Sequence, residues 1–282
     1  MSTLVNQALK RFAWPRTNAP RRLIEAMEYS LYAGGKRLRP LLALCAAEAV
    51  GGRPDDALPA AAALEMIHTY SLIHDDLPAM DDDDLRRGRA TCHKAYDEAT
   101  AILAGDALNT YAFELVLEHV PDPRHAVAVG LELARAAGID GMVGGQMADV
   151  EAEGAAPDLQ RLVYIHEHKT GALIAGAVTC GAILGGASPP QLDCLRRYGR
   201  GIGLAFQVVD DILDMTATAE QLGKSPGKDA AANKMTYPRV MGIEKARAHA
   251  QELIRKALDE LAVLPAPHGL RVVAEYFVSR AH

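Results

Sequence analysis

The stretch HDDLPAMDDDDLRRGR, residues 74–89, places six aspartates within ten positions and follows them at once with arginines. Carboxylates this close repel one another: two of them about 4 Å apart cost roughly 4 kcal/mol at an effective dielectric near 20. Either water on an exposed loop or a bound cation therefore balances the charge. The residues around the aspartates favour the cation for some of them and water for others.

The residues before this stretch predict a buried helix. The segment AAAALEMIHTYSLI, residues 60–73, is almost uncharged and contains no helix breaker, so its carboxyl end should deliver Asp75 and Asp76. Pro78 then ends the helix, because its ring would clash with the preceding turn. The carboxyl end of a helix already carries partial negative charge, which makes it an unfavourable place for two aspartates.

Carboxylates kept in such a place indicate a divalent metal. Magnesium fits best, because proteins bind it through few carboxylates and leave room for phosphate oxygens. We expect Asp75, Asp76 and Asp81 to belong to this site, whereas residues 82–84, taken alone, are typical of a solvated acidic loop.

The composition fits one large domain, residues 1–282. The chain is 49% hydrophobic and 23% charged, which is ordinary for a soluble globular protein. Helical periodicity, few β-branched alternations and short Gly- or Pro-marked connections predict an all-α fold. A net charge of -6 argues against a general nucleic-acid-binding protein, so small anions are the better candidate ligands.

Several features indicate the cytoplasm and no membrane span. The four cysteines have no CxxC spacing, which favours free thiols in a reducing compartment over disulfides or zinc. Residues 1–12 lack the apolar core of a secretion signal. The apolar run at residues 171–187 is shorter than the ~20 residues of a membrane span, and its glycines and alanines predict a tightly packed core helix.

A basic motif, GGKRLRP, occupies residues 34–40. An amphipathic helix over residues 21–33 should stop at the two glycines, and Pro40 should lie early in the next helix. Lys36 and Arg39 then lie close to a helix amino terminus, where cations are unfavourable unless an anion is bound there. An exposed basic loop remains the alternative for this motif alone.

A second acidic motif, QVVDDILD, ends the apolar helix predicted over residues 199–209. Asp210 and Asp214 lie one turn apart and share a face, with Gln207 a turn earlier. Aspartates on an apolar helix are uncommon unless they are paired or bind a metal. This helix end is therefore a second candidate metal site.

A cationic stretch interrupts the long helix predicted over residues 159–187. A kink at residues 168–171 would turn Lys169 and a freed carbonyl into a cavity, or the helix breaks there with Thr170 as a cap. The loop at residues 222–228, which contains Lys224, either folds over a phosphate or is solvated surface.

Together these motifs resemble short-chain trans-isoprenyl diphosphate synthases over nearly the whole chain. The first aspartate-rich motif, DDLPAMD, has the two-residue insertion typical of the bacterial farnesyl diphosphate synthase type, and DDDLRRG follows it. GGKRLRP, HKTGALI, FQVVDDILD and LGK occur in the order expected for that family. The combination of two acidic and several basic motifs is highly specific.

The resemblance implies an all-α isoprenoid synthase bundle around a central cavity, with the two acidic motifs at its mouth, in a homodimer. A cluster of three magnesium ions, for which manganese can substitute, would bridge the motifs. The implied metal ligands are Asp75, Asp81 and Asp210, and the supporting catalytic aspartates are Asp76, Asp211 and Asp214.

The same matching distributes the two substrates. The residues implied to hold the allylic diphosphate are Arg86, Lys169, Gln207 and Lys224. Those implied to hold isopentenyl diphosphate are Lys36, Arg39, His68 and Arg87. Loss of the allylic diphosphate would leave a carbocation sheltered by the carbonyl near Lys169 and by Thr170 and Gln207, and isopentenyl diphosphate would attack it head to tail, from C1′ to C4.

Helix geometry suggests the length of the product. Tyr70 and Ser71 lie five and four residues before Asp75, ~5 to 7 Å along the helix, which is about one isoprene unit. The Tyr70 ring would then act as a floor that gives a fifteen-carbon product, with geranyl and geranylgeranyl diphosphate synthases as alternatives. A terpene cyclase, a head-to-head condensing enzyme or a non-catalytic partner subunit fits less well, since both DDxxD-type motifs and the isopentenyl residues are present.

Overall fold

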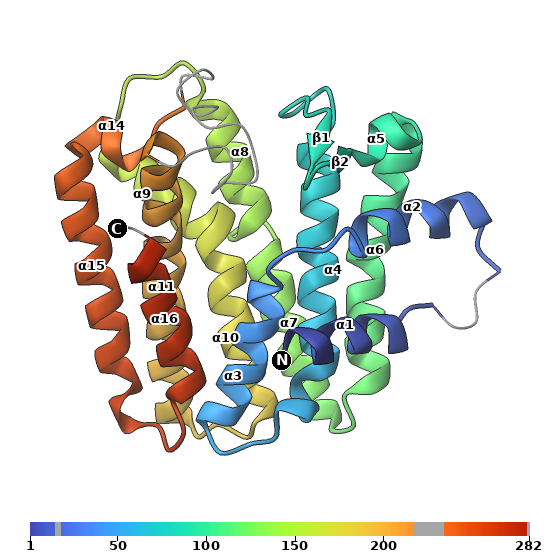
Figure 1. Cartoon of the computed structure of the whole chain (residues 1–282). Coiled ribbons are helices and arrows are strands. Elements are labelled where there is room, and N and C mark those ends of the chain that lie inside the picture. Colours follow the sequence, from blue (N-terminus) through green and yellow to red (C-terminus); the bar gives the residue numbers. More distant parts are fainter. Residues whose placement is uncertain (15–17, 217–233, 281–282) are drawn as a thin grey trace. The chain divides into compact units, whose positions relative to one another are not determined.

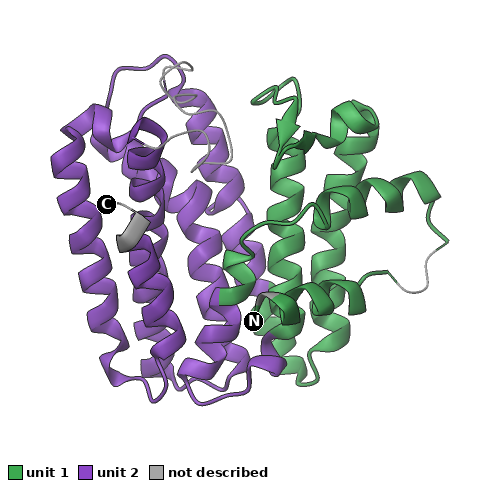
Figure 2. Cartoon of the chain, in the orientation of Figure 1, with its two compact units in different colours: residues 1–41, 58–130 green, residues 42–57, 131–282 purple. Residues whose placement is uncertain are grey.

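The computed structural model describes residues 1–14, 18–216 and 234–280, which form two compact units. Unit 1 contains residues 1–41 and 58–130, and unit 2 contains residues 42–57 and 131–282 (Figure 2). The described elements are almost all helices, which confirms the predicted all-α class. A single domain over residues 1–282 stays a prediction.

Unit 1 is built on two long helices, α4 (Leu58–Asp75) and α6 (Glu98–His119), which lie side by side (Figure 1). Its elements are α1 (Ser2–Arg11), α2 (Arg21–Leu31), α4 (Leu58–Asp75), β1 (Leu85–Arg86), β2 (Arg89–Ala90), α5 (Cys92–Ala95) and α6 (Glu98–His119). The alanines at the start of α4 are fully buried, which lets α6 approach closely. At Gly105 in α6, an added Cβ would lie 2.2 Å from Nε2 of His74 in α4, so any larger residue there would displace the His74 ring.

Two helices belong partly to each unit: α3 (Leu38–Ala49) and α7 (Pro123–Ala137). Pro40 is the third residue of α3, where its missing N–H leaves no hydrogen bond unmade, as the sequence predicted. The preceding helix α2 ends at Leu31, two residues before the predicted end.

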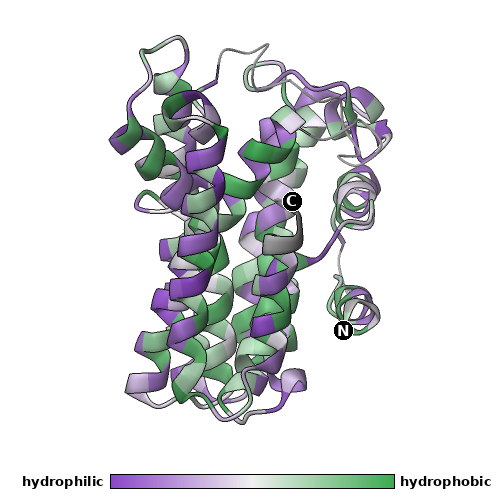
Figure 3. Cartoon of the chain, turned by 60° about the vertical axis from the view of Figure 1, so that its left-hand side comes forward, coloured by the Kyte–Doolittle hydropathy of each residue, from purple (hydrophilic) through white to green (hydrophobic). Residues whose placement is uncertain are grey.

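Unit 2 contains the remaining described elements. These are η1 (Pro54–Ala57), α8 (Met142–Ala152), α9 (Leu159–Ile165), the π-helical turn η2 (His166–Gly171), α10 (Ala172–Leu184), α11 (Pro189–Thr216), α14 (Tyr237–Met241), α15 (Ile243–Glu260), η3 (Leu261–Val263) and α16 (His268–Arg280). Helix α11 packs against both α10 and α15 (Figure 1). Figure 3 shows hydrophobic and hydrophilic residues alternating along individual helices, as in amphipathic helices.

Helix α10 is the packed core helix that the sequence predicted. A Cβ at Gly181 would lie 2.0 Å from the carbonyl oxygen of Ala43, and one at Gly199 would lie 2.8 Å from Cα of Ala175. Glycine therefore allows backbone to touch backbone on two sides of α10. Across the described residues, no helix combines the length and the apolar character needed to cross a membrane.

The short hairpin β1–β2 was not predicted. Leu85 pairs with Ala90 and Arg86 with Arg89, and both intervening residues, Arg87 and Gly88, have positive φ, 54° and 74°. Two left-handed central residues make a type I′ turn, which matches the twist of a hairpin. Strands of two residues are too short to show an alternating pattern, so no sequence signal marks them.

Candidate active site

The first acidic motif begins where α4 ends. Helix α4 stops at Asp75, and the chain then turns back so that the backbone N–H of Asp81 donates to the carbonyl oxygen of Asp75 at 2.9 Å. The turn brings the backbones of these two aspartates together at the carboxyl end of α4, where the sequence placed Asp75, and their role as metal ligands stays a prediction. Asp82 and Asp84 are exposed, and Asp84 pairs with Lys94 at 2.8 Å, which agrees with their interpretation as a solvated loop.

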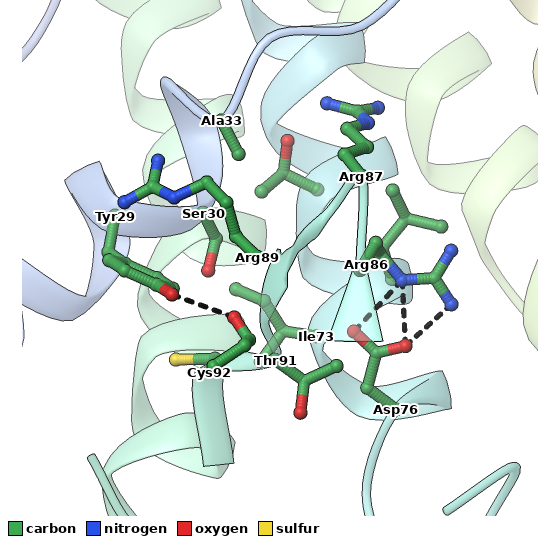
Figure 4. Close-up of a pocket in the computed structure, with 13 residues that line it drawn as sticks. Tyr29, Ser30, Ala33, Ile73, Asp76, Arg86, Arg87, Arg89, Thr91 and Cys92 are labelled. Atoms are coloured by element: carbon green, nitrogen blue, oxygen red, sulfur yellow. Dashed lines mark hydrogen bonds and ion pairs between the residues drawn. The ribbon is translucent and has the colours of Figure 1, made fainter. Parts of the chain in front are cut away.

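Asp76 is held inside unit 1 by Arg86 of the hairpin (Figure 4). It is 3% exposed, and Nε of Arg86 donates to its Oδ1 and Oδ2 at 2.7 and 2.9 Å. Burial raises the pKa of Asp76, although Arg86 opposes the shift. Because both carboxylate oxygens already accept hydrogen bonds from Arg86, Asp76 suits a supporting role better than that of an open metal ligand.

A small pocket lies beside Asp76 and Arg86, and contacts between the residues that line it hold the hairpin in place (Figure 4). Its free volume of about 30 Å³ holds no more than one or two waters, so it cannot take an isoprenyl chain. On its wall the hydroxyl of Tyr29 donates to the carbonyl oxygen of Ala90 at 2.7 Å, and the Arg89 guanidinium lies 4.3 Å from the centroid of the Tyr29 ring. These contacts hold the hairpin that carries Arg86 and Arg87.

Four arginines lie close enough to His68 in α4 to act on its charge. Burial lowers the pKa of His68 well below its usual value, and the charges of four arginines lower it further, so the ring is neutral near pH 7. We call these four residues, Arg37, Arg39, Arg86 and Arg87, the arginine cluster. A neutral imidazole among four guanidinium groups can donate a hydrogen bond to an anion without being charged itself.

Arg39 carries the clearest sign of a ligand. Its Nε is buried and has no hydrogen-bond partner within the described part of the chain. Burial lowers the pKa of Arg39 to about 10, the charge of Arg87 lowers it too, and Glu65 opposes both. A buried guanidinium N–H without an acceptor is costly, and an anion at this position would satisfy it.

The second acidic motif lies in α11 of unit 2. Asp210 is half-buried, and Asp211 and Asp214 are each 3% exposed. Oδ1 of Asp211 accepts from Nε2 of Gln207 at 3.1 Å, and its Oδ2 accepts from the backbone N–H of Tyr237 at 2.9 Å. Asp211 thus links α11 to the start of α14, while Asp210 and Asp214 share another face of the helix.

The predicted kink is a π-helical turn. Residues 166–171 form η2 between α9 and α10, so the helical run continues through this turn without a break. Thr170 does not cap a new helix: the N-cap residue of α10 is Gly171, and Oγ1 of Thr170 donates to Oε1 of Gln207 at 3.0 Å. Nζ of Lys169 lies 2.6 Å from Oδ2 of Asp149 in α8, and both side chains are about one quarter exposed.

Four predicted residues remain: Lys36, Lys224, Tyr70 and Ser71. Lys36 is exposed on the loop before α3, and Lys224 lies outside the described residues. Tyr70 is 9% exposed, and its ring meets the ring of His74 edge to face at 5.5 Å between centroids. Oγ of Ser71 donates to the carbonyl oxygen of His68 at 2.9 Å, which keeps this small side chain against its own helix.

Sequence reasoning assigned no role to three residues that the structure places at these sites: Arg37, Glu65 and Asp149. Each is an ordinary charged residue in the sequence, and its role becomes visible only through an ion pair with a residue far away in the chain. Within the described ranges, no group of three or more His, Cys, Asp or Glu side chains is arranged so that it could hold a metal ion. The carboxylate oxygens present nevertheless suit magnesium, which takes part of its coordination from water and phosphate.

An all-α chain with an aspartate-rich motif at the end of one helix, a second within another and an arginine cluster is a prenyltransferase with the isoprenyl synthase fold. The chain belongs to the polyprenyl synthetase family, because residues 20–263 match that family.

Known relatives differ in the products named for them. A heterodimeric geranylgeranyl pyrophosphate synthase large subunit of Arabidopsis thaliana chloroplasts is 51% identical over 265 residues, covering 92% of this chain and 71% of its own. An FPP/GFPP synthase of Zymomonas mobilis superposes with a TM-score of 0.85 at 42% identity, covering 98% of each chain. A Helicobacter pylori geranyltransferase complexed with magnesium and isoprenyl diphosphate has a TM-score of 0.83 at 35% identity, covering 98% of this chain and 96% of its own.

Proposed function

We propose that this protein catalyses the magnesium-dependent head-to-tail condensation of isopentenyl diphosphate with dimethylallyl and geranyl diphosphate to give farnesyl diphosphate. The observation that carries the proposal is the arginine cluster around neutral His68, with a buried Arg39 N–H that lacks an acceptor. An enzyme that only ionises one allylic diphosphate does not need this second anion site beside its aspartates. A condensing enzyme does, because its second substrate is also a diphosphate.

Isopentenyl diphosphate is assigned to four residues of unit 1: Lys36, Arg39, His68 and Arg87. The neutral ring of His68 and the orphan N–H of Arg39 would donate to its phosphate oxygens, and the two other cations would offset the charge. Charge-assisted hydrogen bonds of this kind are roughly twice as strong as neutral ones.

The allylic diphosphate is assigned to Arg86, Lys169, Gln207 and Lys224. Asp75, Asp81 and Asp210 are the proposed magnesium ligands, and Asp76, Asp211 and Asp214 support them. Magnesium, when bound, neutralises the departing diphosphate. The proposal keeps a cluster of three ions, with manganese as a substitute. The similarity to a protein whose structure contains magnesium supports the choice of metal.

The carbocation that remains would be sheltered by the π-helical turn. The hydrogen bond from Thr170 to Gln207 orients the Gln207 amide. A carbonyl of the π-helical turn near Lys169 would be the second dipole. Fixed dipoles stabilise developing charge without reorganising during the reaction. The released diphosphate is the proposed base for the last proton.

Two candidates compete for the product. The bulky Tyr70 on α4 supports the fifteen-carbon product, because its ring lies about one turn from Asp75. The 51% identity to a geranylgeranyl pyrophosphate synthase subunit supports the twenty-carbon product. We favour farnesyl diphosphate, since Tyr70 is a feature of this chain itself.

We also propose that the protein is a homodimer and is located in the cytoplasm. Helix α6 exposes Leu103 and Leu117, which are 58% and 62% accessible, and apolar side chains exposed on one helix suit a symmetric contact. Light scattering coupled to size-exclusion chromatography should give about twice the chain mass, and a monomer at micromolar concentration would contradict it.

The deciding experiment supplies the purified protein with magnesium, labelled isopentenyl diphosphate and, in separate reactions, dimethylallyl, geranyl or farnesyl diphosphate. We expect label in farnesyl diphosphate with the first two substrates, loss of turnover in excess EDTA and recovery with magnesium. Asp75→Ala and Asp210→Ala should each lower the rate by orders of magnitude. Consumption of an allylic diphosphate without incorporation of label would indicate a cyclase and refute the proposal.

A further inference from the structure

We propose that Arg37 and Glu65 are positioning residues for isopentenyl diphosphate: their buried ion pair holds the loop at residues 34–37 so that Lys36 and Arg39 face the diphosphate. The inference rests on the proposed function, because it deepens the assignment of that anion site. It concerns unit 1 alone and adds two residues that do not themselves touch a substrate.

Arg37 and Glu65 form a buried ion pair. Nη1 of Arg37 lies 2.5 Å from Oε1 of Glu65, and the two side chains are 3% and 2% exposed. Nη2 of Arg37 donates to the carbonyl oxygen of Leu31 at 2.9 Å, and its Nε donates to Oδ1 of Asn6 at 3.2 Å. All three guanidinium nitrogens therefore have partners inside the fold, on α1, α2 and α4. A guanidinium used in this way is a structural tie and does not bind a ligand.

The contacts of Arg37 restrain a loop with positive backbone φ angles. Gly34, Gly35 and Arg37 have φ of 87°, 122° and 50°. Glycine adopts such angles readily, but an arginine does so only where its surroundings hold it. The loop thus has a conformation that its sequence disfavours at Arg37, and the side-chain contacts of that residue are what maintain it. Lys36 and Arg39 lie on either side of this anchor in the chain.

The loop also supports Arg87 of the hairpin. Nη1 of Arg87 donates to the carbonyl oxygen of Gly34, and a Cβ at Gly35 would lie 2.6 Å from the Arg87 guanidinium. Arg87 therefore rests directly on the loop, and a shift of the loop displaces it. Through one anchor, the fold places three of the four proposed isopentenyl residues.

Glu65 also acts electrostatically on two other members of the arginine cluster. The charge of Glu65 opposes the lowering of the pKa of both Arg39 and Arg87. Within the described residues, neither of these arginines forms an ion pair with a carboxylate, whereas Arg37 pairs with Glu65 and Arg86 pairs with Asp76. Two positive charges of the arginine cluster are neutralised, and two remain to meet an anion.

The test replaces the pair as a unit. Arg37→Met together with Glu65→Met removes both charges and keeps flexible apolar volume, whereas either change alone leaves a buried group without its partner. We expect the double variant to fold and to raise the Michaelis constant for isopentenyl diphosphate about tenfold, since misplacement of a binding group by about 1 Å has effects of that order or larger. The turnover number at saturation and the Michaelis constant for geranyl diphosphate should change less than about twofold, because the tie acts on one substrate only.

Asn6→Ala provides a second variant that leaves the ion pair in place. Asn6 is exposed, so the protein should fold, and the loss of one of the contacts that hold Arg37 should raise the same Michaelis constant about threefold. The matched control is Val116→Ala in the core of α6, which should lower the melting temperature without moving either Michaelis constant.

The outcomes are distinguishable. If the double variant is active and its Michaelis constant for isopentenyl diphosphate equals that of the unmodified protein, the positioning role is wrong. If the double variant does not fold, Asn6→Ala decides the question by the same measurement. If the unmodified protein transfers no isopentenyl label at all, the proposed function fails and not this inference.

Discussion

Nζ of Lys169, in the π-helical turn η2, lies 2.6 Å from Oδ2 of Asp149 in α8. The carboxylate restrains a side chain with four rotatable bonds at the point where an allylic diphosphate is proposed to bind. Removing the restraint should cost about 1 kcal/mol of binding, as for other partly exposed ion pairs.

We therefore expect Asp149→Ala to raise the Michaelis constant for geranyl diphosphate about fivefold and to leave that for isopentenyl diphosphate unchanged, since about 1.4 kcal/mol corresponds to a factor of ten. Steady-state kinetics with each substrate varied in turn measures both constants. A rise for isopentenyl diphosphate alone would show that Lys169 serves the other substrate.

The π-helical turn depends on close contact with Gly145 of α8. A Cβ there would lie 2.1 Å from the backbone nitrogen of Lys169, and no rotation of a side chain relieves a clash with backbone. Gly145→Ala should lower the free energy of unfolding by about 3 kcal/mol, as for severe overpacking, and should reduce activity with it.

The matched control for Gly145→Ala is Gly130→Ala in α7. A Cβ at Gly130 meets nothing within 4 Å, so alanine should stabilise the protein by about 0.5–1 kcal/mol through its better helix propensity. Urea denaturation measures both changes. Equal effects of the two substitutions would contradict the close contact.

His166 should make stability depend on pH. Burial lowers its pKa to about 3, and the charge of Lys169 lowers it too, while Asp149 opposes both. The unfolded chain, with an ordinary histidine pKa near 6.5, binds one more proton than the folded chain between about pH 3 and 6.5, so stability rises with pH in this window.

At pH 5 this histidine should therefore cost about 2 kcal/mol of stability relative to pH 7. His166→Phe keeps a ring beside Tyr237 and removes the titration, so the fall in unfolding free energy from pH 7 to pH 5 should be smaller for the variant by that amount. Parallel pH dependences of the two proteins would rule out the neutral buried ring.

The sequence predicted the helices well where local signals determined them. The hydrophobic pattern predicts the buried helix that ends at Asp75, and small residues predict the closely packed helix at residues 172–184. A lysine within an otherwise apolar run marks the π-helical turn before that helix. The hairpin at residues 85–90 left no such signal, because it depends on left-handed angles at Arg87 and Gly88 and on the Asp76 ion pair.

The residues of the site also divide into those that the sequence predicts and those that only the structure reveals. Charged motifs can be found in the chain by their spacing, so Asp75, Asp81, Asp210 and Lys169 could be proposed directly. The partners that orient them come from remote positions: Glu65 is 28 residues from Arg37, and Asp149 is 20 residues from Lys169. No pattern within one helix predicts which charge will meet another after folding, so these positioning residues required the structure.

The last prediction concerns product length and tests Tyr70. Its ring lies against His74, and burial followed by the charges of Asp75 and Asp106 raises its pKa, so the phenol stays neutral and bulky near pH 7. If the ring is the floor, Tyr70→Ala should shift the product from fifteen carbons to twenty or more, because one isoprene unit matches about one helical turn of ~5 Å. Ser71→Phe, one residue closer to Asp75, should shorten the product to ten carbons.

Leu115→Ala is the control, since this truncation in the core of α6 should cost about 2–5 kcal/mol of stability and leave the chain length of the product unchanged. Chromatography of the dephosphorylated products measures all three. An unchanged farnesol peak from an active Tyr70→Ala protein would mean that Tyr70 only packs in the core, and geranylgeraniol from the unmodified protein would establish the twenty-carbon alternative.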